Sequence, residues 1–444
     1  MNRRSHHADL CAASAAVLLV LVAVFVGRHL QDTYRTLFVH WPPLFADWDP
    51  HLGPGTPAAV LVAAGVVAYG PNAAARLPWR GLLLAAWATA LAWTWSLALV
   101  DGWQRGVAGR LTTRNEYLTV IGRFHDIPAA LRDFTHHIVS GSPAPWPAHI
   151  AGHPPGATLT FVLLDRIGLR GGGWAGAWCI TVGTTACVAV LVAVRALADE
   201  RLARRAAPFL ALAPGAVWAG ASADGYFAAV AAWSVALLAL AVTGRSVVCA
   251  AVSGLLFGLT CCLSYGLTLF ALIGAAVVVA GRRRVRERPV LLVLLLAGTA
   301  VVPVAFAVAG FDWWEGYRLL VTRYYQGVGG IRPYGYWVWA NLACTVLITG
   351  PATAAGLRRA AAVPARGRTA PGAEARLALV VAAALFALLA ADLSGMSKAE
   401  TERIWLPFAM WLLPAGALLP RPRAWLVAQA VPALLLNHLL FTGW

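Results

Sequence analysis

Long apolar segments recur along almost the whole chain, and they constrain its fold more than any other feature. About 12 to 14 of them are long enough to cross the hydrocarbon core of a bilayer as helices. Short strands of alternating polarity, which a membrane barrel needs, do not occur. The sequence therefore predicts an all-α polytopic membrane protein that forms one membrane-embedded domain over residues 1–444. The expected spans are 9–28, 56–72, 80–100, 154–169, 174–196, 206–221, 225–243, 247–263, 266–281, 289–310, 336–356, 376–393, 404–420 and 424–442.

Composition and charge agree with a bilayer environment. Of the residues, 60% are hydrophobic and 12% are charged, and the mean hydropathy is +0.68. Soluble domains carry about twice that share of charged residues. The net charge of +16 could indicate nucleic-acid binding, but the arginines are concentrated between the apolar segments, as in the cytoplasmic loops of membrane proteins. We therefore expect a multi-pass protein of the cell membrane, with membrane lipids and no nucleic acid among its partners.

The loops fall into two groups that predict the orientation of the chain. The loops 198–208, 281–289 and 357–376 are rich in arginine and should face the cytoplasm. Other loops carry most of the acids, aromatics and glycines and should face the exterior. They are 101–153, 220–226, 310–335 and 394–403. The segment 154–169 is short and begins with two prolines, so we expect it to be a half-span or a re-entrant helix.

The exterior loop 101–153 is too long to be a simple connector, and loops of this size are usually functional. Within it, Ile127, Leu131, Phe134 and Ile138 recur at helical spacing. This spacing predicts an amphipathic juxtamembrane helix over residues 127–138 that lies on the membrane surface.

Most polar residues other than arginine lie in exterior segments, and these segments supply the candidate site. The segments are TRNEYLTVIGRFHD (113–126), HIAGHPPG (149–156), GASADGYF (220–227) and SGMSKAETERIW (394–405). The catalytic candidates are Glu116 and Asp224. The substrate-binding candidates are Tyr117, Arg123, Asp126, His149, His153, Lys398, Glu402 and Arg403. We expect Glu116, His153, Asp224 and Arg403 to converge around one outward-opening cavity, because an enzyme must hold base, donor and acceptor together.

These motifs resemble those of the C-type (GT-C) integral membrane glycosyltransferases. That family includes the dolichyl-phosphate-mannose protein mannosyltransferases and the lipid A aminoarabinose transferases. Glu116-Tyr117 is similar to the acid and aromatic of its first exterior loop, 127–138 to its juxtamembrane helix, and the HPPG stretch at 153–156 to its His/Lys-Pro-Pro motif. The resemblance covers a module over roughly 80–245, which the additional helices and exterior loops of 246–444 would follow.

The resemblance implies transfer of a sugar from a polyprenyl-phosphate donor to a glycan, lipid or protein acceptor at the exterior face. An acceptor hydroxyl needs a base, for which we assign Glu116, and the departing phosphate needs cationic groups. The candidates for those groups are Arg403, Lys398, Arg123 and His153. Lys398, the only lysine, stands four residues before Glu402, which predicts that the two share one helical face.

No cofactor follows from the sequence, although a divalent cation could assist the transfer. The seven cysteines lie within apolar segments, as single residues and one adjacent pair, without the spacing of a metal site, so we assign no metal ligand.

Each candidate also has a purely structural explanation. Glu116 could be a solvated loop acid, His153 a helix cap, and Asp224 an acid favoured by a helix dipole. Lys398 and Glu402 could form an exposed ion pair.

The main alternative function is a polytopic transporter or flippase for a lipid-linked or small polar substrate, and a weaker one is a membrane acyltransferase. Transporters often show repeated halves and charges at the membrane midplane. The sequence shows no repeat, and its acids lie at the ends of apolar segments, which favours the transferase.

Overall fold

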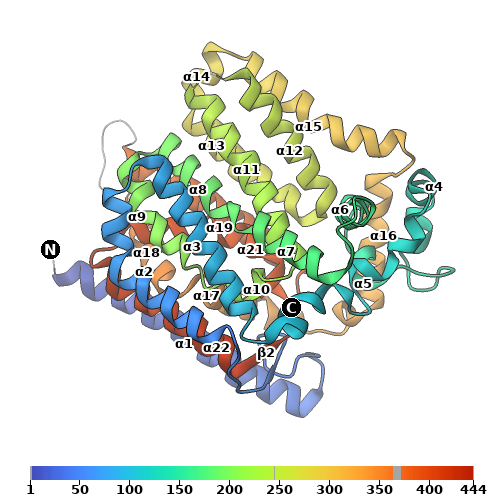
Figure 1. Ribbon diagram of the computed structural model, residues 1–444, viewed down its shortest axis with the longest axis horizontal. Helices are drawn as coiled ribbons and strands as arrows, with labels where there is room; N and C mark the ends of the chain where they lie inside the picture. The colour runs from blue at the N-terminus through green and yellow to red at the C-terminus, as the bar shows by residue number, and fades with distance from the viewer. Residues whose placement is uncertain (1–2, 245, 364–371, 444) are drawn as a thin grey trace.

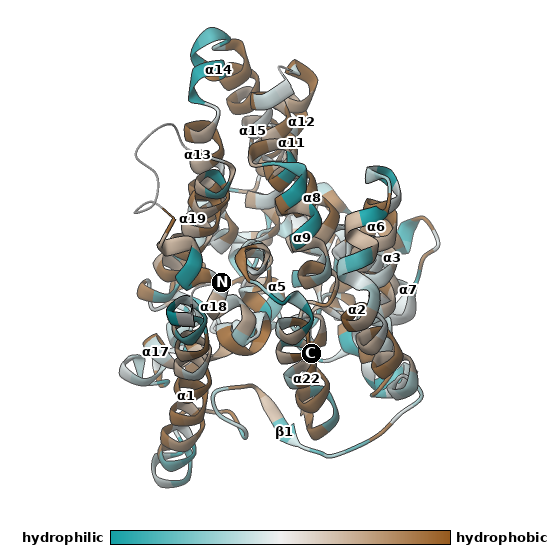
Figure 2. Cartoon of the chain, turned by 90° about the vertical axis from the view of Figure 1, so that its left-hand side faces the viewer, coloured by the Kyte–Doolittle hydropathy of each residue, from teal (hydrophilic) through white to brown (hydrophobic). Residues whose placement is uncertain are grey.

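Helices that could cross a membrane dominate the computed structural model, which describes residues 3–244, 246–363 and 372–443. Within these ranges, seven helical spans are long and apolar enough to do so. They are α1 (Arg3–Tyr34), α2 (Thr56–Arg76), α3 (Trp79–Ala98), α7 (Gly171–Gly183) continuing into α8 (Thr185–Leu197), α11 (Ala223–Gly244), α15 (Val290–Val308) and α19 (Ala373–Leu393). Hydrophobic residues cover the middle of α1 and most of α22 (Pro422–Leu439) in Figure 2. The prediction of an all-α polytopic membrane protein is confirmed.

The other predicted spans are shorter or broken, so the structure has fewer long spans than the 12 to 14 that we expected. The helices α17 (Tyr334–Thr349) and α18 (Pro351–Ala361) meet at 104° and would make an eighth span if counted together. Gly350, with φ +80°, and the proline after it cause this bend. The other predicted spans fall on shorter elements, which are α9 (Glu200–Ala211), α10 (Ala216–Ala219), α12 (Val247–Leu263), η5 (Tyr265–Leu269), α13 (Phe270–Ala280), α21 (Leu406–Ala409) and η8 (Leu413–Leu418).

Arginine-rich segments gather at one end of the bundle, which we call the arginine end. Asp9 Oδ2 of α1 accepts a hydrogen bond from Arg359 Nη2 of α18 at 2.6 Å, and Arg201 Nη2 of α9 lies 3.7 Å from Glu374 Oε1 of α19. In Figure 1, α14 (Arg282–Glu287) lies near the top and α9 and α18 lie at the left, whereas α4 (Ile127–Arg132), α5 (Ala148–Ala151) and α16 (Trp313–Gln326) lie at the right. Residues 364–371 of the predicted loop 357–376 lie outside the described residues.

The predicted exterior loops meet at the opposite end, which we call the loop end. The Ser140 amide of the 101–153 loop donates to Gln326 Oε1 of α16 (Trp313–Gln326) at 2.9 Å. Strand β1 (Ala46–Trp48) pairs antiparallel with β2 (Leu440–Thr442), which ties the C-terminal segment to the same end. The loops 101–153 and 310–335 therefore share one end of the molecule, as the sequence predicted.

The segment after the two prolines does not cross the bundle. Helix α6 (Pro155–Arg166) has 12 residues, which is about 18 Å of helix. It begins beside the start of η3 (Tyr117–Phe124), and at its other end Arg166 donates to the carbonyl oxygen of Phe124 at 3.0 Å. Both ends of α6 therefore remain at the loop end, as expected of a half-span, and α7 and α8 then return the chain to the arginine end.

The predicted amphipathic helix over 127–138 is two short helices. They are α4 (Ile127–Arg132) and η4 (Phe134–His137), separated by Asp133. Phe134 and Ile138 are fully buried, and the Phe134 ring packs edge-on against Phe311 with centroids 5.6 Å apart. The apolar side of this segment therefore packs on the protein.

Candidate active site

Four residues from distant parts of the sequence meet at the loop end, and we call them the central cluster. Glu116 precedes η3, His149 lies on α5 (Ala148–Ala151), Asp224 lies in the first turn of α11, and Arg403 lies on α20 (Thr401–Ile404). His149 Nδ1 lies 2.8 Å from Glu116 Oε1. Arg403 donates from Nη1 to Asp224 Oδ2 at 2.6 Å and from Nη2 to His149 Nε2 at 3.4 Å. The cluster is therefore one chain of contacts from Asp224 to Glu116.

The direction of these contacts fixes the state of His149. A guanidinium only donates, so His149 Nε2 must accept and Nδ1 must carry the ring proton toward Glu116. His149 thus orients the Glu116 carboxylate and links it to Arg403. The sequence placed His149 among the substrate-binding candidates, but it did not reveal this bridge.

The cluster is buried, and its charges stabilise one another. Burial raises the pKa of Glu116, but the neighbouring His149 and Arg403 outweigh this effect, so the pKa of Glu116 is lowered and the carboxylate is ionised at neutral pH. Burial lowers the pKa of Arg403, yet Asp224 and Glu116 raise it above its ordinary value. A buried group of charges is expensive to desolvate and is common at functional sites.

The start of α11 explains why Asp224 sits where it does. The Asp224 amide donates to Ser222 Oγ at 3.2 Å, and the same hydroxyl lies 3.3 Å from Asp224 Oδ2. The carboxylate lies in the first helical turn, where the helix dipole favours a negative charge. A Cβ on Gly183 would lie 2.9 Å from the carbonyl carbon of Gly225, so glycine lets α7 approach the first turn of α11.

The HIAGHPPG stretch folds as a short helix, a turn and the start of α6. Gly152 ends α5, and His153 Nδ1 lies 2.7 Å from the carbonyl oxygen of His149. A Cβ on Gly156 would lie 2.4 Å from the backbone oxygen of Cys262, so this glycine permits close contact between α6 and α12. Burial lowers the pKa of His153 to about 4, so its ring is neutral at pH 7.

Lys398 and Glu402, two predicted site residues, lie outside the central cluster and do not share a helical face. Ala399 and Glu400 have φ of +72° and +61°, so α20 begins only at Thr401. Lys398 Nζ donates to the carbonyl oxygen of Gly329 at 2.9 Å, whereas Glu402 Oε1 accepts from the Phe45 amide at 2.9 Å. The prediction that Lys398 and Glu402 share one helical face is wrong, because the left-handed residues interrupt the helix.

Arg123 and Asp126 also lie outside the cluster. The Arg123 guanidinium lies 3.4 Å from the ring centroid of Trp146. Asp126 caps α4 by accepting from the Ala129 amide at 3.0 Å. Both residues are exposed and have local roles.

Glu400 and Arg332 support the cluster, and sequence reasoning missed both. Glu400 Oε2 lies 3.8 Å from Arg403 Nη2, and its Oε1 lies 3.3 Å from Arg332 Nη1. Arg332 also donates to the carbonyl oxygens of Leu37 and Lys398. The i,i+3 spacing of Glu400 and Arg403 could have signalled the first contact, whereas no local signal points to Arg332.

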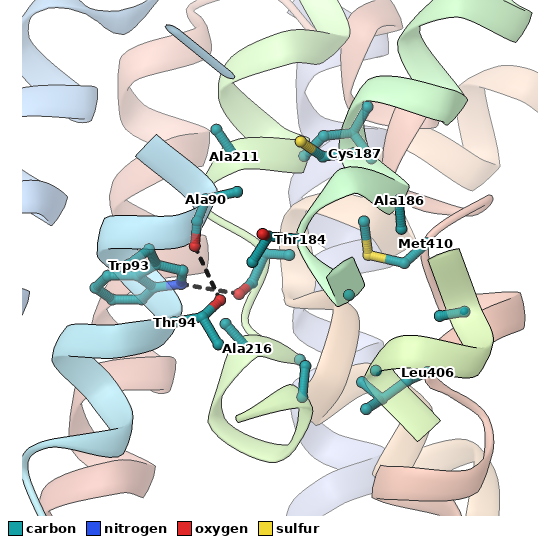
Figure 3. Close-up of a pocket in the computed structure, with 17 residues that line it drawn as sticks. Ala90, Trp93, Thr94, Thr184, Ala186, Cys187, Ala211, Ala216, Leu406 and Met410 are labelled. Carbon is teal, nitrogen blue, oxygen red and sulfur yellow. Dashed lines mark hydrogen bonds between the residues drawn. The ribbon is translucent and has the colours of Figure 1, made fainter. Parts of the chain in front are cut away.

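An apolar cavity lies in the helical bundle beside the start of α11 (Figure 3). It measures about 50 Å³ and is lined by Trp93, Thr184, Gly225, Leu406 and other mostly apolar residues. The Trp93 indole donates to the Ala213 carbonyl oxygen at 2.9 Å, so its polar atom is already satisfied. The cavity has no charged lining residue, and we do not assign it to a polar substrate.

The described residues contain no group of three or more His, Cys, Asp or Glu side chains placed to hold a metal ion. Glu116 Oε2 and Asp224 Oδ1 are the carboxylate oxygens of the cluster that accept no hydrogen bond from a described residue. These two oxygens are the positions at which a cation could be bound.

Comparison with known proteins gives a fold likeness only. No protein-family model matches the chain, and no curated protein matches it. A solved oligosaccharyltransferase from Archaeoglobus fulgidus, in complex with Zn and sulfate, is 16% identical with a TM-score of 0.50, and the match covers 80% of this chain and 52% of that one. A structure of the same protein tethered to an acceptor peptide with the NVT sequon is 12% identical with a TM-score of 0.43, covering 76% and 49%. The chain spans about half the length of this oligosaccharyltransferase, and the likeness shows that it has a GT-C fold.

Proposed function

We propose that this protein is a membrane glycosyltransferase that moves a sugar from a polyprenyl-phosphate donor to an acceptor hydroxyl. The observation that carries the proposal is the central cluster. It joins an ionised carboxylate, an oriented histidine and a permanently charged arginine at the loop end. The phosphate of a lipid-linked sugar lies at the membrane surface, where groups at the ends of membrane helices can reach it. The GT-C fold supports this choice over a transporter or flippase.

The proposed step is a displacement at the anomeric carbon of the donor sugar. The acceptor hydroxyl oxygen forms the new bond to that carbon, and the bond between the carbon and the phosphate oxygen breaks with its electron pair on the phosphate. Glu116 takes the hydroxyl proton, and polyprenyl phosphate leaves. Glycosyl transfer passes through an oxocarbenium-like state, in which the attacking hydroxyl becomes strongly acidic, so a carboxylate with a lowered pKa is a sufficient base.

Arg403 would stabilise the charge that develops on the leaving phosphate. Its guanidinium is fixed by Asp224 and His149, so it needs no reorganisation during the reaction. Charged hydrogen bonds from arginine are among the strongest that a phosphate can receive.

A divalent cation fits the charge of the cluster. Glu116 and Asp224 together carry one charge more than Arg403 neutralises, and each has one carboxylate oxygen without a described donor. Magnesium typically binds through one or two carboxylates and the phosphates of a substrate. Bound there, such an ion would add positive charge beside the phosphate.

The arginine end would face the cytoplasm by the positive-inside rule, which puts the central cluster on the exterior face of the cell membrane. The acceptor would be a glycan, a lipid or a protein reached from that side. The module at 80–245 would supply Glu116 and Asp224, and 246–444 would supply Arg403, so the site needs both parts of the chain.

The test is sugar transfer from a polyprenyl-phosphate sugar by the purified full chain in lipid vesicles. Glu116→Gln should lower transfer by about 10²- to 10⁴-fold, because it removes the proton acceptor at nearly constant volume. Glu287→Gln at the arginine end is the matched control and should transfer at the parent rate. If Glu116→Gln also transferred at the parent rate, Glu116 would not be the base. If the parent moved the donor across the vesicle without breaking its sugar–phosphate bond, the flippase alternative would replace the proposal.

A further inference from the structure

His153 is held in one orientation between aromatic rings beside the central cluster. Its ring centroid lies 6.0 Å from that of Tyr117 and 5.7 Å from that of Phe227. Its Nδ1 lies 2.7 Å from the carbonyl oxygen of His149 and 3.2 Å from the Tyr117 hydroxyl. The residue is not sealed, because 9% of its surface remains accessible.

The contact with His149 fixes which nitrogen carries the proton. A carbonyl oxygen can only accept, so at 2.7 Å the ring must present Nδ1–H to it. Burial lowers the pKa of His153 to about 4, although the nearby Asp224 opposes the shift, so the ring holds a single proton near pH 7. The other nitrogen, Nε2, then has a free lone pair, and no described residue donates to it.

This state excludes the role that the motif first suggested for His153. A phosphate oxygen needs a donor or a positive charge, and the single N–H of this neutral ring is already used by the His149 carbonyl. The partner of Nε2 must itself donate a hydrogen bond, as a sugar hydroxyl does. His149 joins this ring to the proposed base, because its carbonyl oxygen lies 2.7 Å from His153 Nδ1 and its own ring Nδ1 lies 2.8 Å from Glu116 Oε1. A substrate group bound by His153 would therefore enter the same part of the site as Glu116.

Building on the proposed function, we propose that His153 Nε2 accepts a hydrogen bond from a hydroxyl group of the substrate and thereby positions that hydroxyl, rather than the donor phosphate, beside Glu116. The hydroxyl could belong to the acceptor or to the donor sugar, and both sources share the chemistry that His153 would recognise.

Two substitutions distinguish the role of Nδ1 from the role of Nε2. In His153→Asn the amide nitrogen can occupy the position of Nδ1 and keep the hydrogen bond to His149, but no acceptor remains at the position of Nε2. In His153→Gln the side chain reaches the position of Nε2 and can offer its oxygen as an acceptor. We expect His153→Asn to keep the thermal stability of the parent within a few degrees and to raise one KM about tenfold, which is the effect of losing a substrate hydrogen bond. His153→Gln should recover part of that loss.

The KM values for the two substrates show whether the hydroxyl belongs to the acceptor or to the donor sugar. A higher KM for the acceptor assigns the hydroxyl to the acceptor. A higher KM for the polyprenyl-phosphate sugar, with unchanged binding of polyprenyl phosphate alone, assigns it to the donor sugar. Weaker binding of polyprenyl phosphate alone would overturn the proposal in favour of a phosphate contact, and unchanged KM values for both substrates would overturn it as well.

A second measurement stands apart from transfer activity. In the full chain labelled with ¹⁵N-histidine, the signal that disappears in His153→Asn should show a protonated Nδ1 and an unprotonated Nε2 from pH 8 down to pH 5, with or without polyprenyl phosphate. A protonated Nε2 at pH 7 would overturn the proposal even in an active enzyme. If the tautomer is as expected but the parent transfers no sugar, the proposed function fails. His153 Nε2 would still be a hydrogen-bond acceptor in that case.

Discussion

Two buried carboxylate–arginine clusters lie at opposite ends of the bundle, and they differ in how many of their carboxylate oxygens have a partner. At the arginine end, both oxygens of the fully buried Asp9 are occupied, Oδ1 by Arg358 at 2.8 Å and Oδ2 by Arg359 at 2.6 Å. In the central cluster, Glu116 and Asp224 each keep one oxygen that accepts nothing from a described residue.

The charges of the two clusters also have opposite sign. Asp9 faces two arginines, so its cluster is closed and positive, and it ties α1 to α18. The central cluster has two carboxylates and one arginine, so it is open and negative. A closed pair stabilises the fold, whereas an open one bears a desolvation cost without full pairing, which is typical of a site that awaits a ligand.

Replacing arginine by lysine in each cluster should give the largest difference between them. Arg403→Lys keeps the charge but loses the fork that reaches Asp224 and His149 together, so we expect transfer to fall about 10²- to 10³-fold. Arg359→Lys is the matched variant in the closed cluster and should change transfer less than twofold. Initial transfer rates of the two purified variants check this prediction. Similar losses in both would show that the clusters do not differ in function.

Removing the carboxylate of the closed cluster should affect stability instead. Asp9→Asn leaves two arginines without their anion, and we expect a loss of about 3 kcal/mol in the free energy of unfolding. Asp165→Asn is the control, because Asp165 pairs with Arg170 only at 3.9 Å at a partly exposed position. Denaturant unfolding in detergent gives both values. The folded fraction of Asp9→Asn should transfer sugar like the parent, and a selective loss of transfer would contradict a structural role for this cluster.

The sequence selected the residues of the open cluster but not the contacts between them. The residues Glu116, Asp224 and Arg403 stand out in the sequence because they lie in the few polar segments that are not dominated by arginine, and Glu116-Tyr117 also resembles a family motif. His149 could be selected as a candidate, but its bridge joins Glu116 to Arg403 across more than 250 positions, and local patterns carry no signal for such a contact.

The prediction that one helix joins Lys398 to Glu402 was wrong because tertiary contacts override the local helical preference there. The sequence at 398–402 has helical spacing, yet Ala399 and Glu400 adopt left-handed conformations that are rare outside glycine. Arg332 holds this segment by donating to the Lys398 carbonyl oxygen and to Glu400, and it comes from a loop about 70 positions earlier. The prediction of 12 to 14 long spans was wrong for a different reason. Prolines and glycines such as Gly350 interrupt apolar segments that look continuous by composition alone.

Glu402 sharpens the comparison, because it is a fully buried acid and none of the described cationic side chains forms a hydrogen bond with it. Burial raises its pKa to about 7, with the Phe45 amide opposing the shift, whereas in Glu116 the nearby His149 and Arg403 reverse the same effect.

The folded protein therefore holds the Glu402 proton more tightly than the unfolded chain. The stability that this provides is fully present below the ordinary pKa of a glutamate and is lost as the pH rises toward 7. Glu402→Gln stays neutral and keeps an acceptor for Phe45, so between pH 5 and pH 8 it should lose about 2–3 kcal/mol less unfolding free energy than the parent. Glu116→Gln should show no such gain, since the lowered pKa of Glu116 confines its titration to more acidic solutions. Unfolding curves of the three proteins at both pH values test this order, and a parent that was equally stable at pH 5 and pH 8 would show that Glu402 is not a buried neutral acid.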